Sequence, residues 1–258
     1  MESEVVSLLC DPDTRYEFEL EGSSLRNTAT GRVYPIRDGI PLFVSTLSGS
    51  NLKYQALYDR IAPGYDLAET LYRVLLRKPD FRREIISALE ITPGMRVLEV
   101  GVGTGANFRR LPHGIEFHGL DLSWGMLQKC RKNVKRWRRS AQLFQGEAGR
   151  LPFRAEVFDC VFHVGGINFF SEPARAIREM IWVAKPGTKI VIADETEKVV
   201  RDGYQKNPAI KSYFPPGSEA VRCPIDLVPE EMEEIRAREI AGGKLYLLSF
   251  RKPAQAAR

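Results

Sequence analysis

A short apolar strand followed by three closely spaced glycines constrains the fold of this chain more than any other feature. The segment MRVLEVGVGTGA runs from Met95 to Ala106, and its first six residues are mostly apolar, as a buried parallel strand requires. Gly101, Gly103 and Gly105 follow at alternate positions. Glycine permits positive φ and lets a ligand approach the backbone without meeting a Cβ. In a doubly wound sheet, this arrangement forms the ligand-binding crevice at the carboxyl end of a strand.

The spacing of the glycines weakens an interpretation as a dinucleotide site. It is G-x-G-x-G, whereas the pyrophosphate fingerprint is G-x-G-x-x-G. Glu99 precedes the turn, and a carboxylate repels a pyrophosphate but attracts a cation. A second predicted strand, 115–120, leads to Asp121, which lies about 20 residues after the glycine turn. An acid at this position accepts hydrogen bonds from ribose hydroxyls. The two acids predict a nucleoside ligand that carries a positive centre and no pyrophosphate.

Four further motifs follow in a fixed order. They are DLS at 121–123, GEAGRLPF at 146–153, FDCVF at 158–162 and VAKPG at 183–187. Together with EVGVGTG, this series resembles the class I S-adenosylmethionine (SAM) methyltransferases, and within them the methyltransferase-11 group, which includes the quinone C-methyltransferases. The resemblance covers residues 54–252, and because five motifs keep the family's order it is far more specific than the glycine triplet alone.

The resemblance implies an α/β fold, a Rossmann-like seven-stranded sheet with helices on both faces and a C-terminal antiparallel hairpin. This domain is expected over residues 47–252, followed by a disordered tail at 253–258. Hydrophobic patterning places the other elements. Strands are predicted at 141–145, 157–164 and 189–193, helices at 67–76, 81–89, 106–111 and 173–184, and the hairpin at 234–250. A long irregular segment, 197–229, lies where the family builds its substrate lid.

The first 46 residues are predicted to form a small separate β-module. YEFEL alternates as a strand does, and an Asp-Gly turn follows near Asp38. The string YPIRDGIPLF resembles the end of the Trm112-like zinc ribbon that some methyltransferases carry. In that module two cysteine pairs hold zinc, and the corresponding positions here are Cys10 with Asp13 and Asn27 with Thr30. Three of the four thiols are missing, so no metal is expected.

The resemblance also implies the cofactor and the residues that contact it. SAM is the expected cofactor, and S-adenosylhomocysteine is the product. The expected contacts are Glu99, Gly101, Gly103, Gly105, Asp121, Leu122, Met126, Glu147, Ala148 and His163, together with Tyr65 from a segment that folds over the cofactor in the family. Tyr58 is the alternative to Tyr65. Glu147 stands where the family usually has an aspartate that binds the adenine amino group.

The predicted activity is methyl transfer to a small apolar or aromatic acceptor by in-line displacement. In such a reaction the protein supplies orientation and electrostatics, and whether it needs a general base depends on the acceptor. Candidate bases are His163, Asp194, Glu195 and Tyr213. Aromatic residues near the end of the fourth predicted strand favour an apolar acceptor. Two alternatives stay open, an RNA (rRNA base) methyltransferase and a non-catalytic SAM-binding protein.

Composition is that of an ordinary globular protein, with 43% apolar and 28% charged residues. No apolar run approaches the roughly 20 residues of a membrane helix, and the N-terminus lacks the pattern of a signal peptide, so a cytoplasmic protein is expected. The four cysteines and three histidines show no metal-ligand spacing. Seven basic residues within 129–139 predict either a solvated helix face or contact with nucleic acid or a membrane surface.

Overall fold

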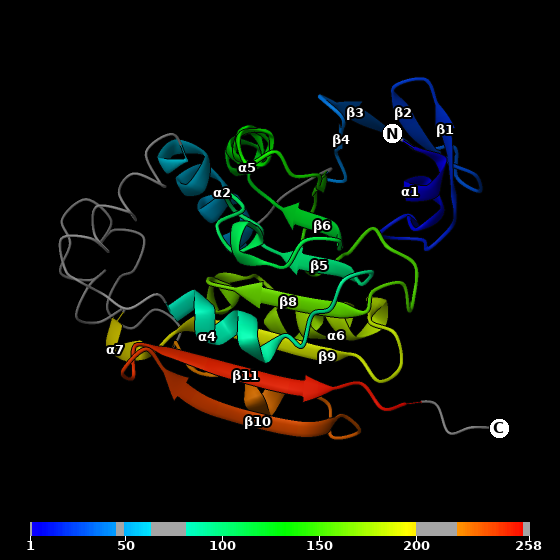
Figure 1. Cartoon of the computed structure of the whole chain (residues 1–258). Helices are drawn as coiled ribbons and strands as arrows, with labels where there is room; N and C mark the ends of the chain where they lie inside the picture. The colour runs from blue at the N-terminus through cyan, green and yellow to red at the C-terminus, as the bar shows by residue number, and fades with distance from the viewer. Residues whose placement is uncertain (1, 45–48, 63–80, 200–220, 255–258) are drawn as a thin grey trace.

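A seven-stranded sheet forms the centre of the molecule (Figure 1). The computed structural model describes residues 2–44, 49–62, 81–199 and 221–254. The strand order is β10-β11-β9-β8-β5-β6-β7. In that order the strands span Glu233–Ile240, Leu245–Arg251, Lys189–Glu195, Cys160–Val164, Arg96–Val100, Glu116–Asp121 and Gln142–Gln145.

Strands β5 to β9 are parallel, and the hairpin β10–β11 joins β9 in antiparallel register. β5 lies between β6 and β8, so the chain leaves β5 toward one side of the sheet and later returns to its other side. In open α/β sheets this reversal opens a crevice at the carboxyl ends of the strands. The predicted Rossmann-like sheet and its C-terminal hairpin are confirmed.

Helices cover both faces of the sheet. α4 (Phe81–Ala88), the 3-10 turn η1 (Phe108–Arg110) and α5 (Trp124–Arg136) contribute to one buried cluster, and α6 (Pro173–Val183) contributes to the other. Alternation along β5 feeds both clusters, because Val97 belongs to the first and Leu98 and Val100 belong to the second. The shorter described elements are α1 (Ser3–Ser7), α2 (Gly49–Ile61), η2 (Ile167–Phe169), α7 (Glu197–Val199) and η5 (Ile225–Leu227).

Two predicted elements are shorter in the structure than the sequence indicates. The helix predicted over 106–111 is the single turn η1, because Pro112 favours an extended conformation at Leu111, whose ψ is 152°. The strand predicted over 157–164 begins at Cys160, since the backbone amides of Val157 and Phe158 donate to the carbonyl of Val183 at the end of α6. The helix predicted over 67–76 lies outside the described residues.

The N-terminal residues form a second, four-stranded antiparallel sheet. Its strands are β1 (Phe18–Glu21), β2 (Ser24–Asn27), β3 (Val33–Arg37) and β4 (Ile40–Pro41), in that spatial order. The rings of Phe18, Tyr34 and Phe43 pack together with centroids 5.3–5.7 Å apart. Figure 1 shows this sheet beside the large one, near β6.

Backbone pairing ties this small sheet to the body. Beyond β4, Leu42 forms a parallel bridge with Gln145, and the amide of Phe43 donates to the Gln145 carbonyl over 2.8 Å. A second bridge joins Leu9 to Phe153. The large sheet is therefore continued beyond β7 by the N-terminal segment, next to the residues that follow β7.

Hydrogen bonds close the two turns at which the resemblance would place zinc ligands. In the first, one oxygen of buried Asp11 accepts from the amides of Asp13 and Thr14, each at 2.9 Å. In the second, the Asn27 side-chain oxygen accepts from the amides of Ala29 and Thr30, also at 2.9 Å.

Tyr34 donates to the other oxygen of Asp11 over 2.8 Å, and the Asn27 amide donates to Thr14 Oγ1 over 2.9 Å. Within the described ranges, no group of three or more His, Cys, Asp or Glu side chains is arranged to hold a metal ion. The side chains of Asp11 and Asn27 thus hold the two turns through hydrogen bonds. This network is a main source of order in so small a sheet.

Asp11→Ala is expected to lower the free energy of unfolding by about 3 kcal/mol, because it leaves buried donors unsatisfied. Burial alone would raise the pKa of Asp11, but its hydrogen bonds outweigh burial and lower the pKa below the usual range. The stabilisation is thus present above the ordinary carboxyl pKa and is lost as the pH falls through the lowered value. Denaturant unfolding at several pH values measures this.

The matched control is Asp13→Ala, which removes solvent-exposed ion pairs with Arg32 and Arg150 and should cost at most about 1 kcal/mol. Equal losses for the two variants would contradict the role given to Asp11.

Helix α5 carries the basic run. Ser123 caps its N-terminus, since Ser123 Oγ accepts from the Met126 amide over 3.0 Å. At the other end, the Arg139 guanidinium donates to the carbonyls of Phe108, Leu111 and Pro112, so this residue closes the η1 turn. Lys132, Lys135, Arg136 and Arg138 are exposed. Contact of this surface with nucleic acid or a membrane stays a prediction.

Of the described helices, none has the length and apolarity needed to cross a bilayer.

Candidate cofactor and active site

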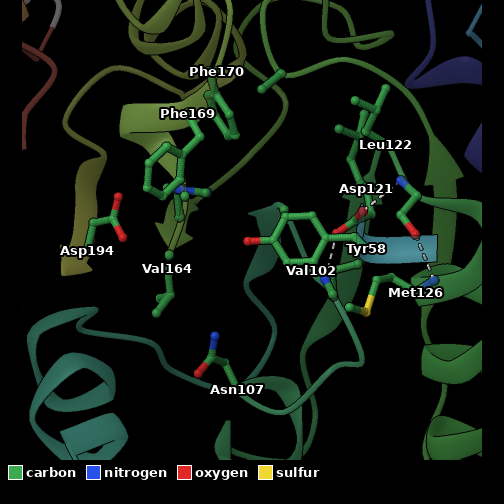
Figure 2. Close-up of a pocket in the computed structure, with 18 of the residues that line it drawn as sticks. Tyr58, Val102, Asn107, Asp121, Leu122, Met126, Val164, Phe169, Phe170 and Asp194 are labelled. Atoms are coloured by element: carbon green, nitrogen blue, oxygen red, sulfur yellow. Dashed lines mark hydrogen bonds between the residues drawn. The ribbon is translucent and has the colours of Figure 1, made fainter. Parts of the chain in front are cut away.

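A cavity opens at the carboxyl ends of the parallel strands. Its wall draws on the loops after β5, β6, β7, β8 and β9 and on helices α2 and α4. Figure 2 shows two groups of lining residues on opposite sides, with the Tyr58 ring between them in this view. One side carries Asp121, Leu122 and Met126, and the other carries Val164, Phe169, Phe170 and Asp194. The first side is the end of β6, and the second joins the ends of β8 and β9.

The glycine turn brings the backbone to the cavity. Gly101 and Gly103 line it and have φ of +74° and +54°. A Cβ on Gly101 would lie 3.1 Å from two atoms of the His163 ring, so only glycine leaves this approach open. Gly105 is not among the lining residues, and a Cβ there would lie 2.9 Å from Cys130 Sγ on α5. Its role in the structure is to let the turn pack on α5, and a contact with the cofactor stays a prediction.

Asp121 joins the glycine turn to the end of β6. Its Oδ2 accepts from the Gly103 amide over 2.7 Å, and its Oδ1 accepts from the Ser123 amide over 2.9 Å. Burial raises the pKa of Asp121 to about 6, against the effect of these hydrogen bonds. The carboxylate is therefore fixed in direction before any ligand arrives. Leu122 and Met126 lie beside it, and Glu147 and Ala148 line the cavity after β7.

Helix α2 closes the cavity on the side of Asp121. Gln55 and Tyr58 line the cavity, and Asp59 Oδ1 accepts from Ser123 Oγ and from the Gly125 amide, at 2.5 and 2.8 Å. Gly125 permits this contact, since a Cβ there would lie 3.1 Å from the Asp59 Cα. Tyr65 lies outside the described residues. Tyr58 thus lines the cavity, and the contact of Tyr65 with the cofactor stays a prediction.

Glu99 does not line the cavity but lies behind it. Its side chain is completely buried, and its Oε1 accepts from the Asn107 side-chain amide over 2.7 Å. Burial raises the pKa of Glu99 to about 8, although the hydrogen bond from Asn107 and the charge of Arg82 oppose that rise. Direct contact of Glu99 with the cofactor stays a prediction, and Asn107 is the residue of this pair that faces the cavity.

His163, at the end of β8, is fully buried and is held in one tautomer. Its Nδ1 lies 2.6 Å from the Val100 carbonyl, an acceptor, so Nδ1 carries the proton and Nε2 offers its lone pair. Nε2 has no hydrogen-bond partner among the described residues. Burial lowers the pKa of His163 below its usual value, although the Asp194 carboxylate and the Val100 hydrogen bond act in the opposite direction. The ring is therefore a neutral proton acceptor near pH 7.

Asp194, at the end of β9, belongs to a small polar cluster. Its Oδ1 accepts from the Glu195 amide over 2.8 Å, and its Oδ2 accepts from the Asn168 side-chain amide over 3.2 Å. The same amide donates to Tyr246 Oη over 3.1 Å. Asp194 and Glu195 line the cavity, whereas Tyr213 lies outside the described residues. Of the candidate bases, His163, Asp194 and Glu195 are thus brought together.

Sequence reasoning missed Arg82 and Asn107 as lining residues. Arg82, on α4, is only 8% exposed and donates from Nε to Asn107 Oδ1 over 2.9 Å. A signal for Arg82 exists in the sequence, because it lies three residues before Ile85 and seven before Leu89, on the apolar face of the predicted helix. A charged residue on such a face points to a buried partner or ligand.

Comparison with known proteins decides the family of the central domain. Residues 98–192 match the sequence profile of a family described as a methyltransferase domain. These residues run from β5 into β9 and include the cavity-lining loops after β5, β6, β7 and β8, whereas α2, α4 and the residues from Ala193 onward lie outside the match. The chain carries a class I SAM-dependent methyltransferase domain. SAM is accordingly the cofactor of this domain, and the match does not extend to the N-terminal module, whose likeness to a zinc ribbon stays a prediction.

Relatives of the methyltransferase domain include demethylmenaquinone methyltransferases. The one from Renibacterium salmoninarum is 36% identical over 140 residues, which cover 54% of this chain and 57% of that enzyme. The one from Desulfitobacterium hafniense is 27% identical over 227 residues, covering 77% and 89%. For the first of these and several others, the chain spans little more than half of the relative's length.

A solved structure supports the fold of the methyltransferase domain. A SAM-dependent methyltransferase from Thermotoga maritima aligns with a TM-score of 0.57 and 21% identity, and the alignment covers 77% of this chain and 99% of that one. The residues of the cavity fit SAM chemically. Asp121 offers carboxylate oxygens to a ribose, Gly101 leaves open space where a Cβ would collide, and a buried cation faces the side of Asn107.

Proposed function

We propose that this chain transfers the methyl group of SAM to a small, neutral aromatic acceptor of the hydroquinone type. The observation that carries the proposal is the second half of the cavity, in which an apolar wall surrounds a buried histidine with a free Nε2 lone pair. Val164, Phe169 and Phe170 form that wall. Aromatic side chains of this kind stack against a ring and exclude water. The names of the relatives agree with an acceptor of this class.

Bound SAM supplies a methyl group that is activated by a sulfonium. The walls of the cavity hold the acceptor so that its nucleophilic carbon or oxygen lies in line with the methyl carbon and the sulfur. A bond forms between acceptor and methyl, the carbon–sulfur bond breaks, and its electron pair stays on sulfur in S-adenosylhomocysteine. The acceptor must also lose a proton, and His163 Nε2 takes it. The Asp194 carboxylate favours the imidazolium that results.

The charge of the cavity disfavours a nucleic acid as acceptor. Glu147, Glu172, Asp194 and Glu195 line it, and their charges repel a phosphate backbone. The exposed basic residues of α5 are not part of this wall. RNA methylation is therefore the second candidate, supported only by the basic helix.

The proposal is tested by incubating the protein with SAM labelled in its methyl group and separate acceptors. One acceptor is a reduced naphthoquinone that lacks a ring methyl and carries a short prenyl chain, and the other is an rRNA fragment. Label is expected in the hydroquinone and not in the RNA. Labelled RNA would replace the proposal by its alternative. Binding of S-adenosylhomocysteine without transfer to either acceptor, or to a wider panel of phenols, would favour a non-catalytic SAM-binding protein.

A further inference from the structure

Helix α5 and the residues after it carry a cluster of positive charges without acidic neighbours in sequence. The chain has no acidic residue over 122–146, whereas 129–139 holds seven basic ones. Three of the seven have partners within the protein, namely Lys129, Arg131 and Arg139. The other four are exposed and form no ion pair within the part of the chain that the structure describes; they are Lys132, Lys135, Arg136 and Arg138. Such a cluster repels itself and attracts anions.

Helix geometry brings these charges onto one face. Lys132, Lys135 and Arg136 are three and four residues apart, so their side chains are neighbours on the helix surface. The exposed Arg109 of η1 joins them at the end of α5, because its guanidinium lies 5.8 Å from the centroid of the Trp137 ring. The residues that bury α5 against the sheet lie on its other side. We call this face, Arg109 together with the four unpaired cations, the α5 basic surface.

The helix that carries the α5 basic surface also begins at the cavity. Its N-cap Ser123 and its residue Met126 both line the cavity. A helix of 13 residues is about 20 Å long, so the basic surface lies within about that distance of the cavity. In Figure 1, α5 lies on the outside of the molecule, beside α2, against which it packs. A large anionic surface that binds α5 is therefore held close to the site of methyl transfer.

We propose that the α5 basic surface binds the anionic headgroups of a phospholipid bilayer and thereby brings the cavity to an acceptor dissolved in the lipid. This inference rests on the proposed function, because a neutral aromatic acceptor partitions from water into an apolar phase. A cluster of four or more Lys and Arg on a helix suits anionic lipid, and each cation adds to the attraction.

The exposed side chains of α5 favour a bilayer over single-stranded RNA. Among the described residues, the large apolar and aromatic side chains that are exposed lie outside α5. Proteins that bind single strands combine positive charge with aromatic rings on which the bases stack. The α5 basic surface offers charge without such rings, which is sufficient for electrostatic contact with lipid headgroups.

Sedimentation with lipid vesicles tests the proposal on the full chain. Vesicles of phosphatidylcholine with about 30% phosphatidylglycerol should bind the protein, and vesicles of phosphatidylcholine alone should not. Binding should be lost at about 1 M salt, at which the Debye length falls to about 3 Å. Replacing the four unpaired cations by glutamine should weaken binding to the anionic vesicles at least about 100-fold, since each cation contributes about fivefold. The substitutions are Lys132→Gln, Lys135→Gln, Arg136→Gln and Arg138→Gln.

A control variant removes the same charge from other surfaces. It combines Arg83→Gln, Arg178→Gln, Arg236→Gln and Lys244→Gln, four exposed residues on α4, on α6, on β10 and between β10 and β11. It should bind the anionic vesicles like the unaltered protein. Calorimetry with S-adenosylhomocysteine should give the same affinity for both variants, which shows that both are folded. Equal loss of vesicle binding in the two variants would overturn the proposal, because net charge would then explain it.

Two further outcomes would overturn the proposal. One is that the unaltered protein fails to bind the anionic vesicles. The other is that an RNA fragment displaces the vesicles at equal ionic strength and that its binding depends on the same four cations, which would assign the surface to RNA.

The vesicle assay needs no acceptor, so its result is separate from that of the proposed function. Vesicle binding without methyl transfer to any hydroquinone leaves the lipid contact standing and contradicts only the proposed function. Methyl transfer to a water-soluble hydroquinone without vesicle binding contradicts only this inference. If both hold, the glutamine variant should methylate the water-soluble acceptor at the normal rate and lose activity toward an acceptor embedded in anionic vesicles.

Discussion

His163→Gln is expected to lower kcat by about 100- to 10,000-fold, the range that a general base contributes. Glutamine keeps a polar side chain of similar length, but its amide has no basic nitrogen. In the structure the Val100 carbonyl holds the proton of His163 on Nδ1, which leaves Nε2 as a buried acceptor without a hydrogen-bond partner among the described residues, on a side chain that lines the cavity. The substitution therefore removes the proton acceptor and keeps the rest of the wall. Affinity for S-adenosylhomocysteine should change by less than about twofold. A fall in kcat with unchanged affinity means that the interaction lost is one made only in the transition state.

Steady-state kinetics with SAM and the acceptor that the protein methylates measure kcat. Calorimetry measures the affinity for S-adenosylhomocysteine. The matched control is His113→Gln, which changes an exposed histidine that does not line the cavity. Normal kcat in His163→Gln would return His163 to a structural role.

The pH profile gives a further check on the same residue. Because burial lowers the pKa of His163, the neutral base persists at pH values at which an ordinary imidazole is already protonated. In the unaltered protein kcat/KM should stay constant through neutral pH and decline only below the ordinary imidazole range of about 6.5. The groups that face the ring are the Asp194 carboxylate, the Val100 carbonyl and the Phe170 ring, 5.0 Å away between centroids. Asp194→Asn should move the decline to still lower pH.

Asp121→Ala is expected to weaken binding of S-adenosylhomocysteine about 10- to 150-fold, or roughly 1.5–3 kcal/mol, the worth of hydrogen bonds to a charged acceptor. The alanine also releases the amides of Gly103 and Ser123, so the glycine turn loses its anchor. Since the pKa of Asp121 is about 6 in the unliganded protein, the affinity of the unaltered protein should fall as the pH drops below that value. Protonation removes acceptor capacity and thus opposes binding.

Calorimetry between about pH 5 and 8, a range that includes the Asp121 pKa of about 6, tests both expectations. Glu116→Ala, at the opposite end of β6, is the control, since its carboxylate is exposed and pairs with Arg96. Unchanged affinity in Asp121→Ala would exclude a contact with the cofactor.

The centre of the site is predictable because it depends on local backbone. The glycine turn, the acid at the end of β6 and the histidine at the end of β8 all follow from strand ends that meet at one edge of a parallel sheet. The sequence shows each strand, and the sheet rule brings the ends together. Asp121 and His163 were placed in this way.

Other parts of the site depend on packing that patterns in sequence do not reveal. Glu99 looks like a ligand of a cation because it is an acid in a binding motif, yet alternation along β5 directs it to the face that carries α4 and η1. Arg82 reaches the cavity only because α4 packs beside that strand. The contact of Asp59 with α5 joins residues 64 positions or more apart, and no local pattern encodes it. The direction of Glu99 could be inferred from alternation along the strand. The positions of the helices that bring Arg82 and Asp59 to the site could not be inferred from any local pattern.

The attachment of the N-terminal sheet to the body sets an order of events during synthesis. Leu9 bridges to Phe153, and the Arg154 amide donates to the Leu8 carbonyl, so partners on the two sides are separated by more than half the chain. Leu8 and Leu9 therefore lack these partners until residue 154 has been made. Through that interval the small sheet depends on its own strand pairing, aromatic packing and hydrogen-bonded turns, while β5 and β6 emerge behind it. Closure of the ends of such a long loop is slow compared with local pairing, so docking is a late step in folding.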